Sequence, residues 1–275
     1  MSIWSAIVLG LVQGVAEFLP ISSSGHLAIF QNLFGMDTGQ DNLLFDVLLH
    51  TGTLVAVCFV YRRDIADIFR GLFAGRRAAG DAAARSKVLG GRRLFLMLLI
   101  ATVPLVIVIP FRDYIDALTA NTYFVGAALI VTGVILFASD RLARGSKTEK
   151  TMRVSDAVAV GICQAVATVP GLSRSGTTIS MGMASGLDRE FAVKFSFLLS
   201  IPAVLGATLV SLYDALKQGV RLSLPYLVGA LVAMVVGYFA INLVRGLSKR
   251  GQFGKFAYYC WAVGLLAILL TLILG

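Results

Sequence analysis

Long apolar runs alternate with short polar stretches along this chain, and six of the runs are long enough to cross a bilayer. The six predicted spans are residues 43–61, 94–111, 122–139, 191–213, 224–244 and 256–274. Two further apolar segments, 2–33 and 155–187, are interrupted by proline, glycine and serine near their middles. Irregular backbone at membrane depth is tolerated only where protein buries it or where it lines a cavity. Each broken segment therefore predicts a re-entrant hairpin of two short helices.

The two halves of the chain show the same order of segments, a broken segment followed by three spans. Residues 10–16 (GLVQGVA) resemble residues 161–167 (GICQAVA), and a proline and a serine–glycine turn follow each. Because three is an odd number, the second half would enter the membrane from the opposite side. The predicted fold is an all-α polytopic membrane protein, with six transmembrane helices and two re-entrant helical hairpins in an inverted repeat. It forms a single membrane domain (1–275), with repeat halves at 1–150 and 151–275.

Composition and charge agree with this class and set an orientation. Hydrophobic residues make up 57% of the chain and charged residues 14%, while the net charge is +9. The basic residues gather in the linkers 62–93, 140–153 and 245–255, which places these linkers in the cytoplasm. Counting two spans back from the linker 245–255 places residues 188–190 in the cytoplasm as well. The segment 155–187 therefore begins and ends on the same side of the membrane. No basic face carries interleaved aromatic residues, so we expect no nucleic-acid partner.

The break in the first segment carries polar side chains that are costly inside a bilayer. The motif from Gln13 to His26 reads QGVAEFLPISSSGH. An ionised group at mid-membrane costs at least ~2.5–3.5 kcal/mol, so the cluster indicates chemistry or substrate binding. Gln13 lies one helical turn before Glu17, and its carbonyl oxygen can join the carboxylate on one helix face. Such an oxygen pair suits a divalent cation such as Mg²⁺, although a carboxylate that caps a broken helix is the structural alternative.

The serine turn of this motif combines hydroxyls with backbone N–H groups. If a half-helix starts near Ser23 or Ser24, its N-terminus is an anion site, and Ser22 and Gly25 belong to the same turn. Helix capping is the plainer explanation of a serine run. The nearby His26 favours a functional reading, because a hydroxyl beside a base is the pattern of an activated nucleophile. Direct attack by His26 or by water is equally compatible with the sequence.

The break in the second segment reads PGLSRSGTT from residue 170 to residue 178. Its arginine, Arg174, is a planar donor fork set among hydroxyls and glycine N–H groups, which favours bidentate phosphate binding. It would also neutralise charge in a phosphoryl-transfer transition state. The alternative is an ion-paired or snorkelling arginine. The residues predicted to bind substrate beside it are Gly171, Ser173, Ser175 and Thr178.

Two titratable residues, Asp46 and His50, lie one turn apart at the start of the span 43–61 and are predicted to line the outer mouth of the site. For His50, a hydrogen-bonded core or interfacial histidine is the structural alternative. The chain has no G-x-x-x-x-G-K-[ST] loop, which excludes a P-loop ATPase.

Together these motifs resemble those of the undecaprenyl-diphosphate phosphatase family of bacterial membrane proteins, the bacitracin-resistance type. The resemblance rests on [E/Q]-x-x-x-E at residues 13–17, F-L-P-[IV]-S-S-[ST]-G-H at 18–26 and P-G-x-S-R-S-G-x-T at 170–178. It extends to the spacing of the apolar segments along essentially the full chain. Many members of the family carry glutamate where this chain has Gln13, so Glu17 is the only strong acid of its motif.

The resemblance implies a phosphatase that removes the terminal phosphate from a C55 polyprenyl diphosphate and so recycles the lipid carrier of cell-wall synthesis. It also implies a divalent cation, with Mg²⁺ expected, and a bacterial plasma membrane location with the site open to the outside. On this basis Glu17 and Gln13 help to hold the cation, and Arg174 clamps the diphosphate with the hydroxyls around it. Ser23 then attacks the terminal phosphorus, with His26 as its acid/base partner.

The alternative function comes from another class of protein. Broken helices in an inverted repeat are also the architecture of secondary transporters, so the runner-up is a transporter or flippase of an anionic lipid or metabolite. A transporter, however, has no need of an arginine, a serine, a glutamate and a histidine grouped for phosphoryl transfer. Glycine-rich stretches such as residues 126–133 permit close helix packing, which serves either the fold of one chain or a homodimer.

Overall fold

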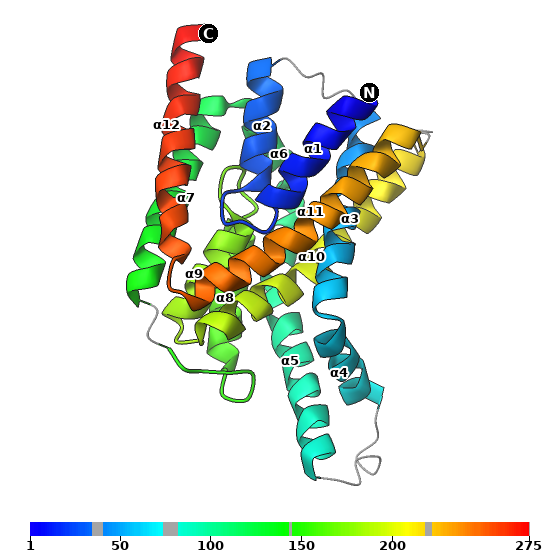
Figure 1. Ribbon diagram of the computed structural model, residues 1–275, viewed down its shortest axis with the longest axis vertical. Helices are drawn as coiled ribbons and strands as arrows, with labels where there is room; N and C mark the ends of the chain where they lie inside the picture. The colour runs from blue at the N-terminus through cyan, green and yellow to red at the C-terminus, as the bar shows by residue number, and fades with distance from the viewer. Residues whose placement is uncertain (35–40, 74–81, 143–144, 218–221, 275) are drawn as a thin grey trace.

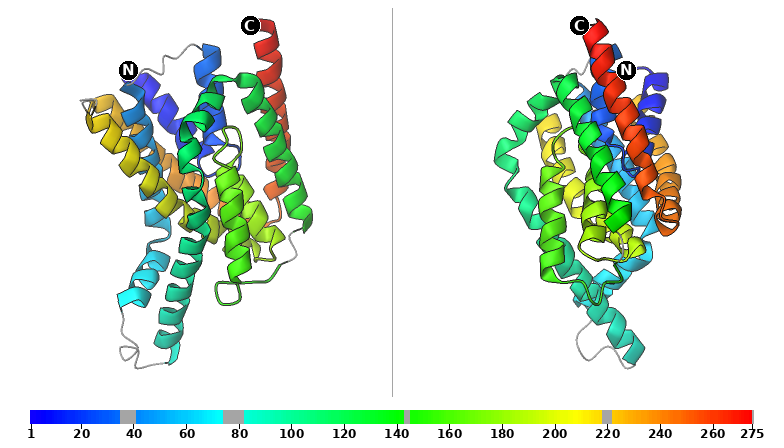
Figure 2. Two further views of the ribbon diagram at one scale, coloured as in Figure 1. Left: turned by 180° about the vertical axis from the view of Figure 1, so that it is seen from behind. Right: turned by 90° about the vertical axis from the view of Figure 1, so that its left-hand side faces the viewer.

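The computed structural model describes residues 1–34, 41–73, 82–142, 145–217 and 222–274, and within these ranges the regular elements are helices (Figure 1). The one extended pairing in the described parts is a single bridge between Lys147 and Leu187. Both chain ends lie at the same end of the molecule, and the tip formed by α4 (Arg62–Phe73) and α5 (Ala82–Val106) lies at the other (Figures 1 and 2). An even number of crossings between the two termini explains this placement.

The predicted spans correspond to long helices at nearly the predicted positions. These helices are α3 (Asp41–Val60), α5 (Ala82–Val106), α7 (Thr122–Leu142), α10 (Arg189–Lys217), α11 (Leu224–Lys249) and α12 (Phe256–Leu274). Within the described ranges five helices are long and apolar enough to cross a membrane, and the bent pair of α3 and α4 makes a sixth. Large apolar side chains such as Leu265 and Ile273 of α12 point outward, as lipid contact requires. The prediction of an all-α polytopic membrane protein is confirmed.

The linker predicted after the first span is itself largely helical. It contains α4 (Arg62–Phe73), which is bent by 77° from α3, and α5 begins at Ala82, well before the predicted start of its span at residue 94. Hydropathy marks only the part of a helix that lies in lipid, whereas backbone hydrogen bonding continues the same helix through polar sequence. The linker before α7 likewise forms short helical turns: η1 (Ile109–Phe111), α6 (Arg112–Ala117) and η2 (Leu118–Ala120).

Each broken segment is a pair of short helices, α1 (Ile3–Ala16) with α2 (Ser23–Phe34) and α8 (Val154–Val166) with α9 (Arg174–Ala184). The second pair returns to the side on which it starts, as the charge pattern predicts. Its base is fastened by Lys147, whose Nζ donates to Asp156 at the start of α8 (2.9 Å) and to the carbonyl of Ser185 at the end of α9 (2.7 Å).

The tips of the two hairpins meet inside the molecule, having entered from opposite ends (Figures 1 and 2). The hydroxyl of Ser22 in the first tip donates to the carbonyl of Leu172 (3.4 Å), and the hydroxyl of Ser175 in the second donates to the carbonyl of Leu19 (3.2 Å). An inverted repeat would produce this arrangement, although the division of the chain into halves at residue 150 stays a prediction.

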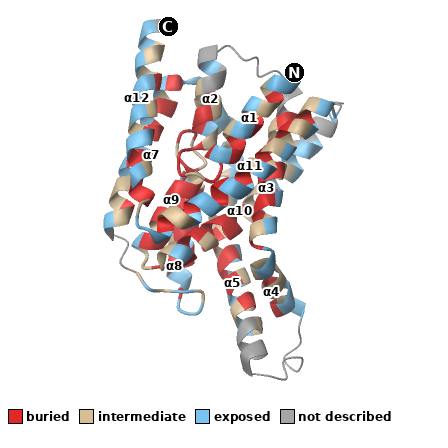
Figure 3. Ribbon diagram, viewed as in Figure 1, coloured by how far each residue is buried: buried red, intermediate tan, exposed pale blue. Residues whose placement is uncertain are grey.

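The buried residues concentrate around the two tips, at the level where α9, α10 and α11 cross (Figure 3). Phe18, next to Glu17, is 1% exposed and packs edge-on against Phe197 of α10 at a centroid distance of 5.4 Å. Glycines let backbones approach closely here: a Cβ on Gly10 of α1 would lie 2.5 Å from the carbonyl oxygen of Gly229 of α11. The core therefore holds the hairpin tips rigidly in the middle of the protein.

The glycine-rich stretch 126–133 of α7 packs within the chain. A Cβ on Gly126 would lie 2.9 Å from the carbonyl oxygen of Gly264, and one on Gly133 would lie 3.0 Å from that of Ala257. Both partners belong to α12, so this stripe serves the fold of one chain. The homodimer stays a prediction, and it would need a different surface.

Candidate functional site

Two helix N-termini converge where the hairpin tips meet. Ser22 precedes α2 and its Oγ accepts a hydrogen bond from the N–H of Gly25 (3.1 Å), while Ser173 precedes α9 and accepts from the N–H of Gly176 (3.1 Å). The two serines thus cap the two helices in the same way. Because free backbone N–H groups and the helix dipole make an N-terminus locally positive, the facing ends of α2 and α9 favour an anion between them.

A small cavity of about 50 Å³ lies between these helix ends, and both hairpins line it. The cavity combines a carboxylate, a guanidinium and several hydroxyls with few apolar groups. The lining residues are Ala16, Glu17, Ser22, Ser23, Ser24, Ala167, Leu172, Ser173, Arg174 and Ser175.

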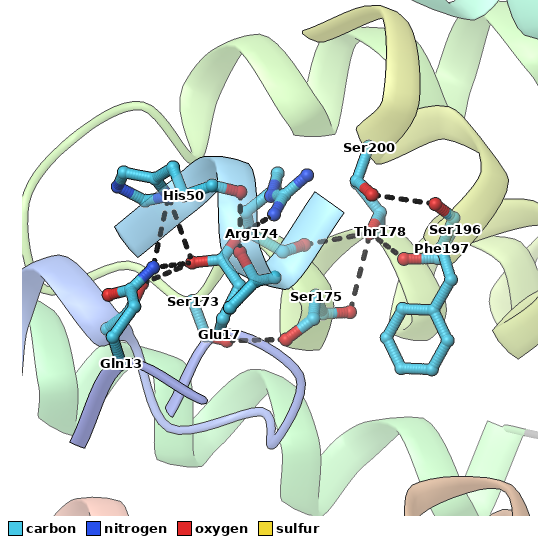
Figure 4. Close-up of polar contacts among 12 residues, drawn as sticks. Gln13, Glu17, His50, Ser173, Arg174, Ser175, Thr178, Ser196, Phe197 and Ser200 are labelled. Atoms are coloured by element: carbon cyan, nitrogen blue, oxygen red, sulfur yellow. Dashed lines mark hydrogen bonds and ion pairs between the residues drawn. The ribbon is translucent and has the colours of Figure 1, made fainter. Parts of the chain in front are cut away.

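Glu17 and Arg174 form an ion pair across the two hairpins (Figure 4). Nη2 of Arg174 donates to Oε1 of Glu17, whose side chain is 6% exposed, and such a buried charge requires a partner. The second terminal nitrogen of Arg174, Nη1, is buried and has no hydrogen-bond partner among the described residues. The guanidinium therefore holds Glu17 with one nitrogen and offers the other to an anion.

The second oxygen of Glu17 lies beside the predicted nucleophile. Ser23, the first residue of α2, donates its hydroxyl to Oε2 of Glu17 at 2.8 Å. The same oxygen accepts from Nε2 of Gln13 at 3.1 Å. A carboxylate that accepts from a serine hydroxyl is in position to take the proton when the oxygen attacks.

The amide of Gln13 turns its nitrogen, not its carbonyl oxygen, toward Glu17. Nε2 also lies 3.0 Å from Nδ1 of His50, which in turn is 3.7 Å from Oε2 of Glu17 (Figure 4). A carboxylate attracts a donor and repels a carbonyl, which fixes this orientation. The predicted oxygen pair of Gln13 and Glu17 is therefore not formed in this structure. Oε1 of Gln13 is buried and has no hydrogen-bond partner in the described part of the chain.

Ser22 adopts a left-handed backbone conformation at the break, with φ of +68°. A non-glycine residue pays roughly 1–2 kcal/mol for that conformation. The carbonyl of Ser22 accepts from the backbone N–H of His26 (3.1 Å) and lies 2.8 Å from Nδ1 of the same residue. The other ring nitrogen, Nε2, lies 2.9 Å from the hydroxyl of Tyr259. Both nitrogens of His26 are thus engaged away from Ser23.

Comparison with known proteins identifies the family. The family model described as "Bacitracin resistance protein BacA" matches residues 6–266. The chain belongs to the BacA family. It is 39% identical over 279 residues to the "Undecaprenyl-diphosphatase" of Methanosphaera stadtmanae, with 100% of each chain covered. It is 39% identical to the protein of that name from Halothermothrix orenii (98% of this chain, 99% of the relative) and 42% identical to that from Syntrophotalea carbinolica (96% and 97%).

In this BacA-family chain, the predicted site residues divide into those at the cavity and those that support it. Glu17, Ser23 and Arg174 meet as the motifs predict. The sequence predicts that His26 acts as the partner of Ser23, but the structure shows a different contact. The His26 ring bonds to the carbonyl of Ser22, four positions earlier at the helix start. The remaining predicted residues at the cavity are Ser22, Ser24, Ser173 and Ser175.

Thr178 supports the site from behind rather than lining the cavity. Its Oγ1 donates to the carbonyl of Arg174 (2.8 Å) and meets Oγ of Ser196 in α10 at 2.6 Å (Figure 4). The first turn of α9, which carries Arg174, is thereby tied to a long transmembrane helix. This contact positions Arg174 and leaves no Thr178 hydroxyl hydrogen for a substrate.

The predicted glycines let the two tips of this BacA-family protein come together. A Cβ on Gly25 would lie 3.0 Å from Cα of Gly171. Gly171 has φ of +92°, and a Cβ there would lie 2.6 Å from the carbonyl oxygen of Val125. Side chains at these positions would push the hairpins apart, so their role in this structure is close approach rather than direct substrate contact.

Three residues that the sequence does not single out complete the surroundings. Thr132 of α7 accepts from the N–H of Ser173 (3.1 Å) and donates to the carbonyl of Gly171 (3.0 Å), which fixes the second tip. The others are Ser196 and Tyr259. All three lie in apolar spans outside both motifs. A lone hydroxyl in a span is usually satisfied by its own helix, so no local signal distinguishes them.

Proposed function

We propose that this protein is an integral-membrane phosphatase that hydrolyses undecaprenyl diphosphate to undecaprenyl phosphate and inorganic phosphate. This reaction recycles the lipid carrier of cell-wall synthesis. Family membership and full-length relatives named undecaprenyl-diphosphatase support the substrate. The single structural observation that carries the reaction is the grouping of Ser23, Glu17 and Arg174 around one cavity at two helix N-termini, where Nη1 of Arg174 is buried and has no hydrogen-bond partner among the described residues.

The geometry supports a two-step mechanism. In the first step Ser23 Oγ attacks the terminal phosphorus, the bond from that phosphorus to the bridging oxygen breaks, and undecaprenyl phosphate leaves. The serine proton passes to Oε2 of Glu17, its hydrogen-bond partner at 2.8 Å, and then to water. In the second step water attacks the phosphoserine, the bond between Oγ and phosphorus breaks, and one water proton returns to Oγ. Inorganic phosphate carries the other proton.

Arg174 serves both reaction partners at once. Its bond to Oε1 holds the Glu17 carboxylate in the ionised form that can accept the serine proton, while Nη1, which has no partner among the described residues, is available to an oxygen of the terminal phosphate. The N-termini of α2 and α9 add to the stabilisation of charge on the transferred group. The competing scheme of direct attack by His26 has less support, because Ser22 and Tyr259 engage both nitrogens of the ring.

The residues present fit a divalent cation only when substrate oxygens complete its ligand set. Among the described residues no group of three histidine, cysteine or acidic side chains gathers around one point. Glu17 supplies one carboxylate, and a second oxygen is nearby in Oε1 of Gln13, which is buried and has no partner among the residues that the structure describes. We assign these two oxygens to Mg²⁺ in the substrate complex, where the ion would neutralise charge on the diphosphate.

Replacing Gln13 with glutamate is expected to sharpen the cation requirement. The substitution Gln13→Glu puts a second carboxylate where Nε2 now donates to Glu17 at 3.1 Å, and the repulsion is relieved by a divalent cation. Activity in EDTA should fall below that of the parent protein, and the Mg²⁺ concentration for half-maximal rate should drop several-fold. Gln252→Glu, which adds the same charge in the linker before α12, serves as control. Superimposable Mg²⁺ titrations for Gln13→Glu and the parent would contradict the assignment.

We propose further that the protein lies in the plasma membrane with the cavity open to the outer side. The basic linkers lie at the end of the molecule opposite to the two chain termini, and positive linkers stay in the cytoplasm (Figure 1). A β-lactamase fused after the C-terminus should therefore protect cells from ampicillin, whereas a fusion within the linker 145–153 should not. The reverse pattern would invert the orientation and place the first hairpin on the cytoplasmic side.

The decisive test of the function is phosphate release from undecaprenyl or farnesyl diphosphate by the purified protein in detergent, with Mg²⁺ and with EDTA. Cation-dependent release is the expected result. A well-folded protein that binds the lipid diphosphate without releasing phosphate would overturn the proposal in favour of lipid transport.

A further inference from the structure

The left-handed turn at Ser22 sets the position of the proposed nucleophile. Ser23 follows Ser22 directly, so the backbone angles of Ser22 decide whether the Ser23 hydroxyl reaches Glu17. The Ser23 hydroxyl lies 2.8 Å from Glu17 while Ser22 is in the left-handed conformation, which serine adopts only when its surroundings enforce it. The bonds from His26 to the carbonyl of Ser22 hold this conformation, together with the contacts of the Ser22 hydroxyl to Gly25 and Leu172.

The orientation of His26 depends in turn on α12. A backbone carbonyl only accepts, so the ring nitrogen 2.8 Å from Ser22 O, Nδ1, carries a hydrogen. In the neutral ring Nε2 is then an acceptor, and the hydroxyl of Tyr259 donates to it at 2.9 Å. The two rings lie nearly parallel, with an interplanar angle of 6°. The hydroxyl of Tyr259 thus stabilises the same tautomer that bonds to Ser22.

A second contact shows that α12 supports this break at two successive residues. Cys260, which is fully buried, lies with its sulfur 3.6 Å from the carbonyl oxygen of Pro20. Tyr259 itself is 44% exposed, so filling the core is not the reason for a tyrosine here. Its hydroxyl is the part of the side chain that reaches the site.

We propose that Tyr259 is a positioning residue for the reaction, which acts through His26 and the carbonyl of Ser22 to hold Ser23 against Glu17. The proposal rests on the function proposed above. In this proposal His26 is not an acid/base catalyst. Its imidazole instead orients the turn at Ser22 that carries Ser23. Arg174, the proposed phosphate clamp, is not part of this chain of contacts, so substrate binding should not depend on Tyr259.

The experiment compares Tyr259→Phe with Tyr258→Phe. Tyr258 is the adjacent residue, is 62% exposed, and contacts Phe137 and Trp261 rather than the site. Tyr259→Phe keeps the ring and removes the hydroxyl, and we expect kcat to fall about tenfold with KM unchanged, while Tyr258→Phe retains parental values. Equal melting temperatures of the two variants would show that the loss is not unfolding. A kcat within twofold of the parent, or a rise in KM alone, would overturn the proposal.

A readout independent of activity separates this proposal from the proposed function. The chain has two histidines, so a ¹⁵N-histidine NMR spectrum contains two rings, and His50→Asn assigns them. His26 should show its hydrogen on Nδ1 in the parent and in Tyr258→Phe, and a mixture of tautomers in Tyr259→Phe. An unchanged tautomer in Tyr259→Phe would refute the positioning role. An inactive parent that still shows the tautomer shift would refute only the phosphatase function.

Discussion

Removing the guanidinium of Arg174 is expected to reduce phosphate release by about 10³-fold or more. Nη1, which has no hydrogen-bond partner among the described residues, is the proposed donor to the terminal phosphate, and Nη2 pairs with the carboxylate of Glu17 beside Ser23. The variant Arg174→Ala therefore loses both transition-state stabilisation and an ionised base. Steady-state turnover of farnesyl diphosphate in detergent, measured at saturating substrate, checks this expectation.

The same substitution also has an expected cost in stability, which needs its own control. The Glu17 carboxyl group would be left buried without its counter-charge, and removing one partner of a buried ion pair destabilises a fold by about 3–5 kcal/mol. The double variant Glu17→Gln, Arg174→Met removes both charges and should recover the melting temperature without recovering turnover. Arg70→Ala breaks an exposed pair with Asp67 and should change neither. If Arg174→Ala kept a tenth of parental turnover, Arg174 would not be the phosphate clamp.

Ser23→Ala is expected to reduce turnover by about 10³-fold or more and to leave KM little changed, because the serine forms the covalent intermediate and Arg174 still binds phosphate. Parent protein mixed with substrate labelled in its terminal phosphate and quenched in acid should yield a labelled phosphoprotein. The Ser23→Ala protein should yield none.

Ser24 offers the matched control for this experiment. It is adjacent to Ser23 and also lines the cavity, but its hydroxyl contacts Ser22 Oγ (3.3 Å) and not Glu17. Ser24→Ala should therefore keep turnover within a few-fold of the parent and still form the phosphoprotein. Near-normal turnover by Ser23→Ala without a trapped intermediate would favour direct attack by water.

The transmembrane architecture could be predicted because the bilayer imposes it on the sequence. A span needs a long apolar run, and a break in such a run needs protein around it, so both hairpins and the long helices follow from composition alone. The polar start of α5 at Ala82 could not be predicted in this way, since nothing in its hydropathy distinguishes a helix in water from a loop. The bend between α3 and α4 likewise depends on tertiary packing.

The site could be predicted as far as its residue types, but not as far as its contacts. Charged and hydroxyl groups in a membrane are costly, which singled out Glu17, Ser23 and Arg174. The directions of the Gln13 amide and the His26 ring depend on partners 37 and 233 residues away, His50 and Tyr259. No local pattern encodes such a partner, and a tyrosine in an apolar span looks like any lipid-facing aromatic residue.

The mutual support of the two hairpin tips has a consequence for how the protein is made. Arg174 follows its ion-pair partner Glu17 by 157 positions, so the first hairpin is synthesised long before its counter-charge exists. A nascent or truncated chain presents Glu17 in an unfinished cleft, with neither the second helix N-terminus nor the guanidinium in place. Such a chain has a serine but no phosphate clamp. Under the proposed function, hydrolysis of the carrier lipid therefore begins only after the second hairpin has entered the membrane and met the first.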